Sequence, residues 1–301
     1  MKNMNKYENC LLCPRKCGIN RRTGQTGVCG VSSEIKVARA ALHYWEEPCI
    51  SGKRGSGAVF FSGCSLHCVF CQNREISDGK EGKVISKERL SDIFMELAGK
   101  GANNINLVTP GQYIPDIVWA VNDAKSRGMK LPIIYNTSGY ENVTELKLLE
   151  GIVDVYLPDF KYMDSTLSAM YSRAKDYPSV AKQALSEMVR QQPDVVIDDA
   201  TGLIQKGVIV RQLLLPGHVN DAKAVLKYLY DTYHDHVYIS MMSQFTPIAL
   251  KDYPEINRTV TRREYERLVD YAIEIGITNA FIQEGDVAKD SFIPAFDCEG
   301  V

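Results

Sequence analysis

Three cysteines on one short segment form the pattern best suited to chemistry in this chain. Cys64, Cys68 and Cys71 are spaced C-x3-C-x2-C, directly after the apolar run 58–61. Thiolate is the usual ligand of iron–sulfur clusters, so each cysteine can hold one iron of a [4Fe–4S] cube and leave the fourth iron open for reaction. A zinc site with a distant fourth ligand and three unrelated buried thiols are the alternatives. The spacing, the aromatic Phe70 and the following Gln-Asn pair favour the cluster.

Four further cysteines lie near the start of the chain with the spacing C-x2-C-x3-C-x11-C. They are Cys10, Cys13, Cys17 and Cys29. Intervening glycines allow the backbone to wrap closely around sulfur ligands. The group can form a tetrahedral zinc site or hold a second [4Fe–4S] cluster, and its compact, Gly-rich character favours structural zinc. The remaining cysteines, Cys49 and Cys298, are expected to be ordinary thiols without ligand roles.

Composition limits the classes of function. The 301 residues are 45% hydrophobic and carry a formal net charge of −2, which gives no electrostatic reason to expect nucleic acid or an anionic membrane as a partner. The start of the chain is polar, and no apolar stretch approaches the ~20 residues needed to cross a bilayer. Clustered cysteines without a secretory signal indicate metal binding in a reducing compartment. We therefore expect a soluble, cytoplasmic protein.

Short apolar runs alternate with longer amphipathic stretches along the chain. The expected strands are 58–61, 104–108, 132–136, 153–157, 208–215, 237–241 and 280–282. One expected helix carries Leu90, Ile93, Phe94 and Leu97 on one face, with Ser86 as its N-cap. Another begins at Thr261 with Glu264 as the partner in a capping box, and its apolar face carries Leu268, Ala272 and Ile275. This alternation predicts an α/β fold with a parallel sheet, arranged as a barrel or as an open doubly wound sheet.

Two parts are expected along the chain. Residues 1–50 form a Cys-rich metal-binding segment, and residues 51–301 form the α/β domain. The stretch 164–206 is longer than one crossover needs, and its charged helical pattern over 177–192 predicts a helical insertion. In either α/β arrangement ligands gather at the carboxyl ends of the strands, so residues that follow the strands are the candidates for binding.

The three-cysteine loop resembles the signature of the radical S-adenosylmethionine (SAM) superfamily. Much of the chain is similar to homologues of pyruvate formate-lyase activating enzyme, the PflX-like iron–sulfur proteins. The similar stretches are 10–18, 46–52, 60–64, 104–110, 156–162 and 291–297. The resemblance implies a partial (β/α)6 barrel with a small Cys-rich extension and the cluster loop after its first strand. It also implies SAM contacts from Phe70, Thr109, Asn136, Thr137, Asp159, Lys161, Arg211 and Gln244, with no catalytic residue beyond the cluster and SAM.

Several of these residues are expected to bind different parts of SAM. Asp159 and Lys161 are two apart, so their side chains should point the same way and suit the ribose hydroxyls and the carboxylate of SAM. Arg211 is positioned for the methionine carboxylate, and Gln244 for the adenosine. Activating enzymes carry Gly-Gly-Glu where this chain has no acidic residue, so backbone carbonyls or Thr109 would have to serve. The alternatives are turn caps for Thr109, Asn136 and Thr137, an ordinary Asp159–Lys161 ion pair, and a loop brace for Arg211.

The resemblance implies an enzyme that cleaves SAM reductively to a 5′-deoxyadenosyl radical for hydrogen abstraction. It would take its electron from an external donor such as flavodoxin or ferredoxin. The substrate would be a backbone glycine of a glycyl radical enzyme, or else a small molecule or peptide. An iron–sulfur electron carrier or sensor is the alternative outside enzymes. Two interpretations stand for residues 44–47, Tyr-Trp-Glu-Glu: a position over the active site, or core or surface roles, which are favoured.

Overall fold

A computed structural model describes residues 4–248, 250–283 and 294–301 of the chain. Its centre is a mostly parallel β-sheet with the strand order β10-β9-β8-β6-β5-β4-β2-β1-β3, and β7 pairs with β8 outside this order. The strands are β1 (Ile35–His43), β2 (Ser56–Phe61), β3 (Lys83–Ile85), β4 (Ile105–Val108), β5 (Ile133–Thr137), β6 (Val155–Pro158), β7 (Val196–Ile197), β8 (Ile204–Leu213), β9 (Tyr238–Met242) and β10 (Ala280–Ile282).

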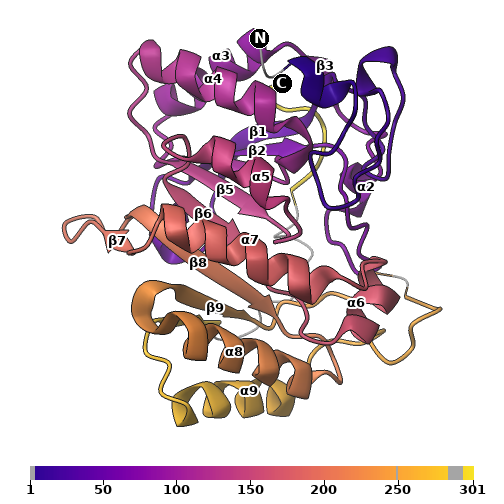
Figure 1. Ribbon diagram of the computed structural model, residues 1–301. Helices are drawn as coiled ribbons and strands as arrows, with labels where there is room; N and C mark the ends of the chain where they lie inside the picture. Colours follow the sequence, from indigo (N-terminus) through magenta and orange to yellow (C-terminus); the bar gives the residue numbers. More distant parts are fainter. Residues whose placement is uncertain (1–3, 249, 284–293) are drawn as a thin grey trace.

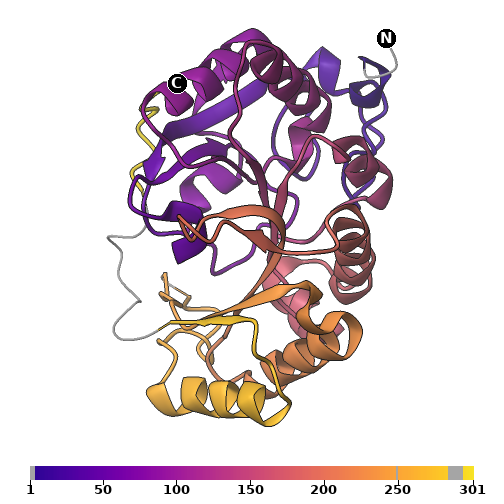
Figure 2. The ribbon, with the colours of Figure 1, turned by 90° about the vertical axis from the view of Figure 1, so that its left-hand side faces the viewer.

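The α-helices are α1 (Pro48–Ser51), α2 (Arg74–Ser77), α3 (Lys87–Gly99), α4 (Ile114–Ser126), α5 (Val143–Leu146), α6 (Ser165–Ser172), α7 (Tyr177–Gln191), α8 (Val219–Tyr233) and α9 (Arg262–Glu274). Most of them cover one face of the sheet (Figure 1), whereas Cys49 and Ile50 of α1 pack on the other face. Turned by 90°, the molecule shows these helices as an outer arc around a curved sheet (Figure 2). The α/β fold expected from the sequence is confirmed.

Each of the seven expected strands is present. These seven strands lie side by side in the order β2, β4, β5, β6, β8, β9 and β10, and each pair of neighbours in this series is parallel. Every residue of β2 and β4 is buried, as strands covered on both faces require. The expected N-caps are also present: the Ser86 side chain accepts from the backbone of Arg89, and Thr261 and Glu264 form a complete capping box.

The sequence interpretation did not include three antiparallel strands. The longest is β1, which pairs with β2 and β3 at one edge of the sheet. The segment 1–50 therefore contains a strand of the central sheet in addition to its four cysteines. The last residues of the chain also lie along β1, because the Ala40 amide donates to the Glu299 carbonyl and the Cys298 amide donates to the Ala38 carbonyl.

The long stretch between β6 and β8 contains the crossover helix of this strand pair as well as additional structure. Helix α7 lies in the chain where the crossover helix of the β6–β8 pair belongs, and it buries Tyr177, Leu185 and Met188. The additional structure is the short helix α6 before it and the β7 strand after it. In the part of the chain that the structure describes, no helix is long and apolar enough to cross a membrane.

Candidate functional site

An open cavity lies where the parallel strands end at their carboxyl side. Its volume is about 210 Å³, and it opens to solvent. The residues that face it from these ends are Val108 at the end of β4, Asn136 from β5, Asp159 and Lys161 after β6, Arg211 from β8, and Met242 and Gln244 from β9 and the loop after it. Carboxyl ends of parallel strands are where α/β proteins bind their ligands.

The three-cysteine loop follows β2 and forms another wall of this cavity. Cys68 and Cys71 line it directly, and Cys64 lies near both. Burial raises the pKa of the Cys68 thiol, and burial together with the neighbouring sulfurs raises the pKa of Cys71 to about 12. These thiols therefore stay protonated until a metal displaces their protons.

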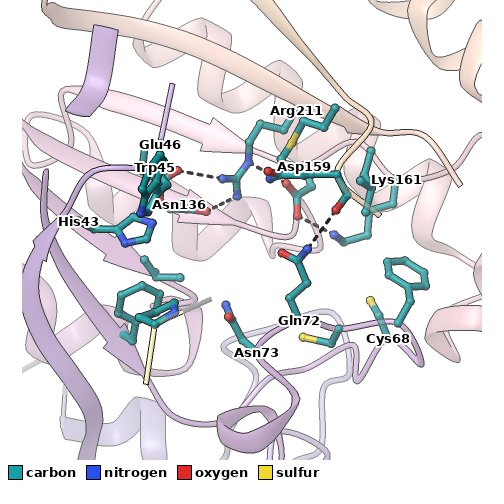
Figure 3. Close-up of a pocket in the computed structure, with 18 residues that line it drawn as sticks. His43, Trp45, Glu46, Cys68, Gln72, Asn73, Asn136, Asp159, Lys161 and Arg211 are labelled. Atoms are coloured by element: carbon teal, nitrogen blue, oxygen red, sulfur yellow. Dashed lines mark hydrogen bonds and ion pairs between the residues drawn. The ribbon is translucent and has the colours of Figure 1, made fainter. Parts of the chain in front are cut away.

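Arg211 lies at the centre of a network of charges across the cavity from Cys68 (Figure 3). Its Nε donates to Asp159 Oδ1 over 3.0 Å, and its two terminal nitrogens donate to Glu46 Oε2 over 3.2 Å and to Asn136 Oδ1 over 2.6 Å. Lys161 Nζ donates to Asp159 Oδ2 over 2.6 Å. Two cations and two carboxylates thus balance one another on one wall.

Opposite charges set the protonation states of this network. Burial alone would raise the pKa of the Asp159 carboxyl, but the charges of Lys161 and Arg211 outweigh it and hold that pKa below its ordinary value. Burial would likewise lower the pKa of Lys161, and Asp159 outweighs it and raises that pKa. Both groups remain ionised, which leaves polar donors and acceptors ready for a charged ligand.

The sequence favours core or surface roles for residues 44–47, but in the structure Glu46 is part of the site. Glu46 accepts from Arg211, from Asn106 over 3.0 Å and from Asn136 over 3.3 Å. Its neighbour Trp45 lines the cavity with 60% of its surface exposed. His43, Gln72 and Asn73 also line the cavity, and the Gln72 side chain donates to the Gln244 carbonyl over 3.1 Å. The sequence interpretation did not assign His43, Gln72 or Asn73 to the site, and for Trp45 and Glu46 it favoured core or surface roles over a position at the active site.

Six of the eight expected SAM contacts line this cavity: Phe70, Asn136, Asp159, Lys161, Arg211 and Gln244. Thr109 and Thr137 lie elsewhere, on a second, smaller cavity behind the cluster loop. Thr137 donates to Glu141 there, and burial raises the pKa of Glu141 to about 7. Thr109 has a φ of 57°, an uncommon conformation for a β-branched residue.

The N-terminal cysteines surround this second cavity. Cys10, Cys13 and Cys29 line it. Cys17 is outside this lining, but it lies near Cys29 and its sulfur packs against Gly27. In the described residues, no three His, Cys, Asp or Glu side chains converge tightly enough to hold one metal ion. Binding of a single ion by these four thiols would therefore require the sulfur atoms to close in, whereas a cluster needs one thiolate at each of its separate irons.

The N-terminal lobe (residues 4–34) packs directly on the cluster loop. Arg15 Nε donates to the Ser65 carbonyl over 2.8 Å, and another nitrogen of the same guanidinium donates to the Ser172 carbonyl over 3.2 Å. Gly63 has a φ of 90°, and a Cβ at this position would lie 2.6 Å from the Cys29 carbonyl oxygen. The two groups of cysteines thus belong to adjoining parts of one structure.

Comparison with known proteins agrees with this architecture. Residues 51–173, which include the three-cysteine loop, match the family model described as a 4Fe-4S single cluster domain. An uncharacterized protein of Methanocaldococcus jannaschii is 28% identical over 275 residues, which cover 89% of this chain and 75% of that protein.

Among solved structures, SuiB of Streptococcus suis bound to S-adenosylmethionine superposes with a TM-score of 0.50 and 13% identity. The match covers 74% of this chain and 48% of SuiB, so it spans about half of that protein. A radical SAM methyltransferase of Sphaerobacter thermophilus has a TM-score of 0.49 and 15% identity, over 76% of this chain and 66% of that one. This chain therefore shares with SuiB an α/β fold, with a mostly parallel central sheet.

Proposed function

We propose that this chain is a radical SAM enzyme whose [4Fe–4S] cluster is held by Cys64, Cys68 and Cys71. The observation that carries the proposal is that one cavity joins the three-cysteine loop to the charged network around Arg211. The match of residues 51–173 to a 4Fe-4S domain supports the cluster. Three thiols on one loop suit a cube that keeps its fourth iron open.

The chemistry of the cavity wall fits SAM. Arg211 uses three of its five N–H groups on Asp159, Glu46 and Asn136, so two remain to donate to the methionine carboxylate. Lys161 likewise donates to Asp159 with one of three ammonium hydrogens. The carboxylates of Glu46 and Asp159 can accept from the ribose hydroxyls or the SAM ammonium. The apolar wall from Phe70, Val108 and Leu213 suits the uncharged parts of the ligand.

The loaded cluster would supply one electron to SAM, giving methionine and a 5′-deoxyadenosyl radical that takes a hydrogen atom from the substrate. The electron would come from an external donor such as flavodoxin or ferredoxin. This chain's residues would hold SAM at the open iron and keep water from the radical. We further propose a polypeptide substrate, a backbone glycine of a glycyl radical enzyme, because the broad exposed ring of Trp45 at the cavity edge suits contact with another protein chain.

We also propose that Cys10, Cys13, Cys17 and Cys29 bind a second metal centre, either structural zinc or a second cluster. Three of these residues line one cavity and the fourth lies near Cys29. The compact Gly-rich segment favours zinc, whereas the separation of the sulfur atoms suits a cluster. Because the N-terminal lobe packs on the cluster loop through Arg15 and Gly63, this centre would help to hold the loop in place.

Release of 5′-deoxyadenosine tests the main proposal. The protein is reconstituted anaerobically and mixed with SAM and dithionite, and the product is measured by chromatography. Product is expected from the wild type and from Cys49→Ala, which removes a buried thiol outside the cluster loop, but not from Cys64→Ala. An intact cluster that neither binds SAM nor forms product would instead support an iron–sulfur electron carrier.

A second measurement tests the substrate class. Candidate glycyl radical enzymes are added to the active protein, and a glycyl radical is sought by electron paramagnetic resonance. The radical signal is expected to need SAM, the reductant and an intact Cys64–Cys71 loop. Active SAM cleavage without a radical on any glycyl radical enzyme, but with modification of a small molecule or peptide, would overturn this part of the proposal.

A further inference from the structure

Arg21 is buried inside the N-terminal lobe, and only 1% of the residue's surface is exposed. It lies in the short 3-10 helix η2 (Arg21–Thr23). Its Nη1 donates to the Gln112 carbonyl over 2.7 Å, and Nε and Nη2 donate to the Ser32 carbonyl. These acceptors satisfy hydrogen bonds, but they carry no net charge. Burying a cation without an opposite charge nearby costs free energy. A buried Arg21 therefore needs a negatively charged group close to it.

Carboxylates do not provide that charge by direct contact. None of the carboxylates that the structure describes lies within ion-pair distance of Arg21. The rings of Tyr7 and Tyr113 flank the guanidinium, with their centroids 4.9 Å and 5.6 Å from its carbon. Such cation–π contacts stabilise the guanidinium, but by less than the burial of a charge costs. Asp116 is reached through Tyr7, whose hydroxyl donates to it.

The remaining candidate for a negatively charged group in direct contact with Arg21 is a cysteine sulfur. Arg21 Nη1 points to Cys10 Sγ over 3.8 Å, and Arg21, Cys10, Cys13 and Cys29 line one small cavity. A neutral thiol offers little to a guanidinium. A cysteine bound to a metal is deprotonated, and four thiolates around a zinc ion or a [4Fe–4S] cluster leave the whole centre negatively charged.

We propose that Arg21 is the buried counter-ion of an anionic four-thiolate metal centre on Cys10, Cys13, Cys17 and Cys29. The inference rests on the second metal centre proposed above and adds its charge and the residue that positions it. Zinc and an iron–sulfur cluster share this chemistry, and metal analysis separates them. The metal centre supplies the negative charge that the buried guanidinium of Arg21 otherwise lacks.

The same residue ties the centre to the radical site. Arg21 donates to the backbone carbonyl of Gln112, and the Gln112 side chain donates to the Ser62 and Gly63 carbonyls over 3.0 Å each. Gly63 immediately precedes Cys64. The counter-ion of the second centre is therefore held by the residue that also fixes the start of the cluster loop, and Arg21 is a positioning residue for both.

The first experiment measures metal in the full-length chain carrying Cys64→Ala, Cys68→Ala and Cys71→Ala, so that only the N-terminal centre reports. Zinc and iron are determined by mass spectrometry, and their affinity by competition with EDTA. Arg21→Met is expected to weaken metal binding by about 10- to 100-fold, as loss of an outer-shell partner does elsewhere. Arg21→Lys should keep more of the affinity. Arg22→Met is the control, because Arg22 is the next residue but pairs with Glu8 at the surface.

The second experiment separates a counter-ion from a merely structural arginine. Urea unfolding of the same parent chain and its Arg21→Met variant is measured with metal bound and after removal by EDTA. The counter-ion role predicts that Arg21→Met destabilises the metal-bound form and is neutral or stabilising in the metal-free form. The same loss of stability in both forms, including failure to fold in both, overturns the inference.

The outcomes distinguish the inference from the centre on which it rests. Metal that persists after Cys10→Ala and Cys29→Ala overturns the second centre itself. Metal that is lost in those variants, but bound equally by Arg21→Met and Arg22→Met, leaves the centre in place and overturns the role of Arg21. Loss of affinity in Arg21→Met with retention in Arg21→Lys and Arg22→Met supports the inference.

Discussion

The Ser172 hydroxyl donates a hydrogen bond to the sulfur of Cys68 over 3.0 Å. Ser172 is the last residue of α6, and the Tyr162 hydroxyl lies 2.8 Å from its oxygen in a fully buried environment. When Tyr162 donates to Ser172, the serine hydrogen is left for the sulfur. A donor to a cluster thiolate withdraws negative charge from it and makes the cluster easier to reduce.

Ser172→Ala is therefore expected to shift the midpoint potential of the cluster to a more negative value. Each kcal/mol by which the hydrogen bond favours the reduced cluster corresponds to roughly 40 mV. A redox titration followed by electron paramagnetic resonance measures the shift. Ser168→Ala is the control, because Ser168 is equally buried in α6 but bonds to the Ser165 carbonyl. Equal potentials in both variants would contradict the prediction.

The sequence predicted the parallel strands and the helix caps well because both are local. A run such as 58–61 is apolar at every position, and Thr261 and Glu264 meet within one turn. Glu46 was missed because its partner Arg211 is 165 residues away, and their contact depends on how β8 lies relative to the segment after β1. Charge pairs of this kind are set by the assembled sheet.

One further difference lies in β5, where Asn136 faces the main cavity and Thr137 faces the second one. Consecutive residues of a strand point to opposite faces, so the two were never able to contact one ligand together. Asp159 and Lys161, two residues apart in the segment after β6, both face the main cavity. Strand alternation was thus a usable signal in the sequence.

Glu46→Gln is expected to weaken SAM binding by about tenfold, the effect of losing one charge-assisted contact of about 1.4 kcal/mol. The carboxylate of Glu46 holds Arg211 and accepts from Asn106 and Asn136, so its loss releases the guanidinium from the geometry that suits a carboxylate ligand. Calorimetric titration of the cluster-loaded protein with SAM provides the affinity. Exposed Glu34 gives the control Glu34→Gln, which should bind as the wild type does. An unchanged affinity of Glu46→Gln for SAM would show that Glu46 does not contribute to SAM binding.

Gly63→Ala is expected to lower the free energy of unfolding by about 2 kcal/mol or more and to reduce the iron content of the reconstituted protein. Its φ of 90° disfavours any side chain, and a Cβ would lie 2.6 Å from the Cys29 carbonyl. Gly24→Ala isolates the backbone effect, because Gly24 has a φ of 84° with no atom within 4 Å of its added Cβ. That control should cost about 1 kcal/mol and keep its iron. Equal effects in the two variants would mean that contact between the lobe and the cluster loop is unimportant.

Glu264 links helix α9 to the loop after β8, and its charge gives a pH-dependent stability. It accepts from the Thr261 amide over 2.9 Å, from the Gly217 amide over 2.8 Å and from Arg258 over 2.7 Å. Hydrogen bonding from Arg258, with further donation from the two amides, outweighs the effect of burial and holds the pKa of Glu264 well below its ordinary value of 4.5. A carboxyl with a lowered pKa in the folded state stabilises the protein above the unfolded pKa and loses that contribution as the pH falls.

Glu264→Gln keeps the capping geometry but removes the charge, so it isolates this effect. At neutral pH the variant is expected to be less stable than the wild type by about 1 kcal/mol. Below about pH 4.5 the difference should shrink, because the wild-type unfolded chain then gains a proton that the folded chain resists. Urea unfolding at several pH values measures the difference. Glu266→Gln is the control, since its partner Arg262 is 92% exposed and the pair should contribute little at any pH. A difference for Glu264→Gln that stays constant on acidification would show that hydrogen-bond geometry, rather than charge, is what Glu264 contributes.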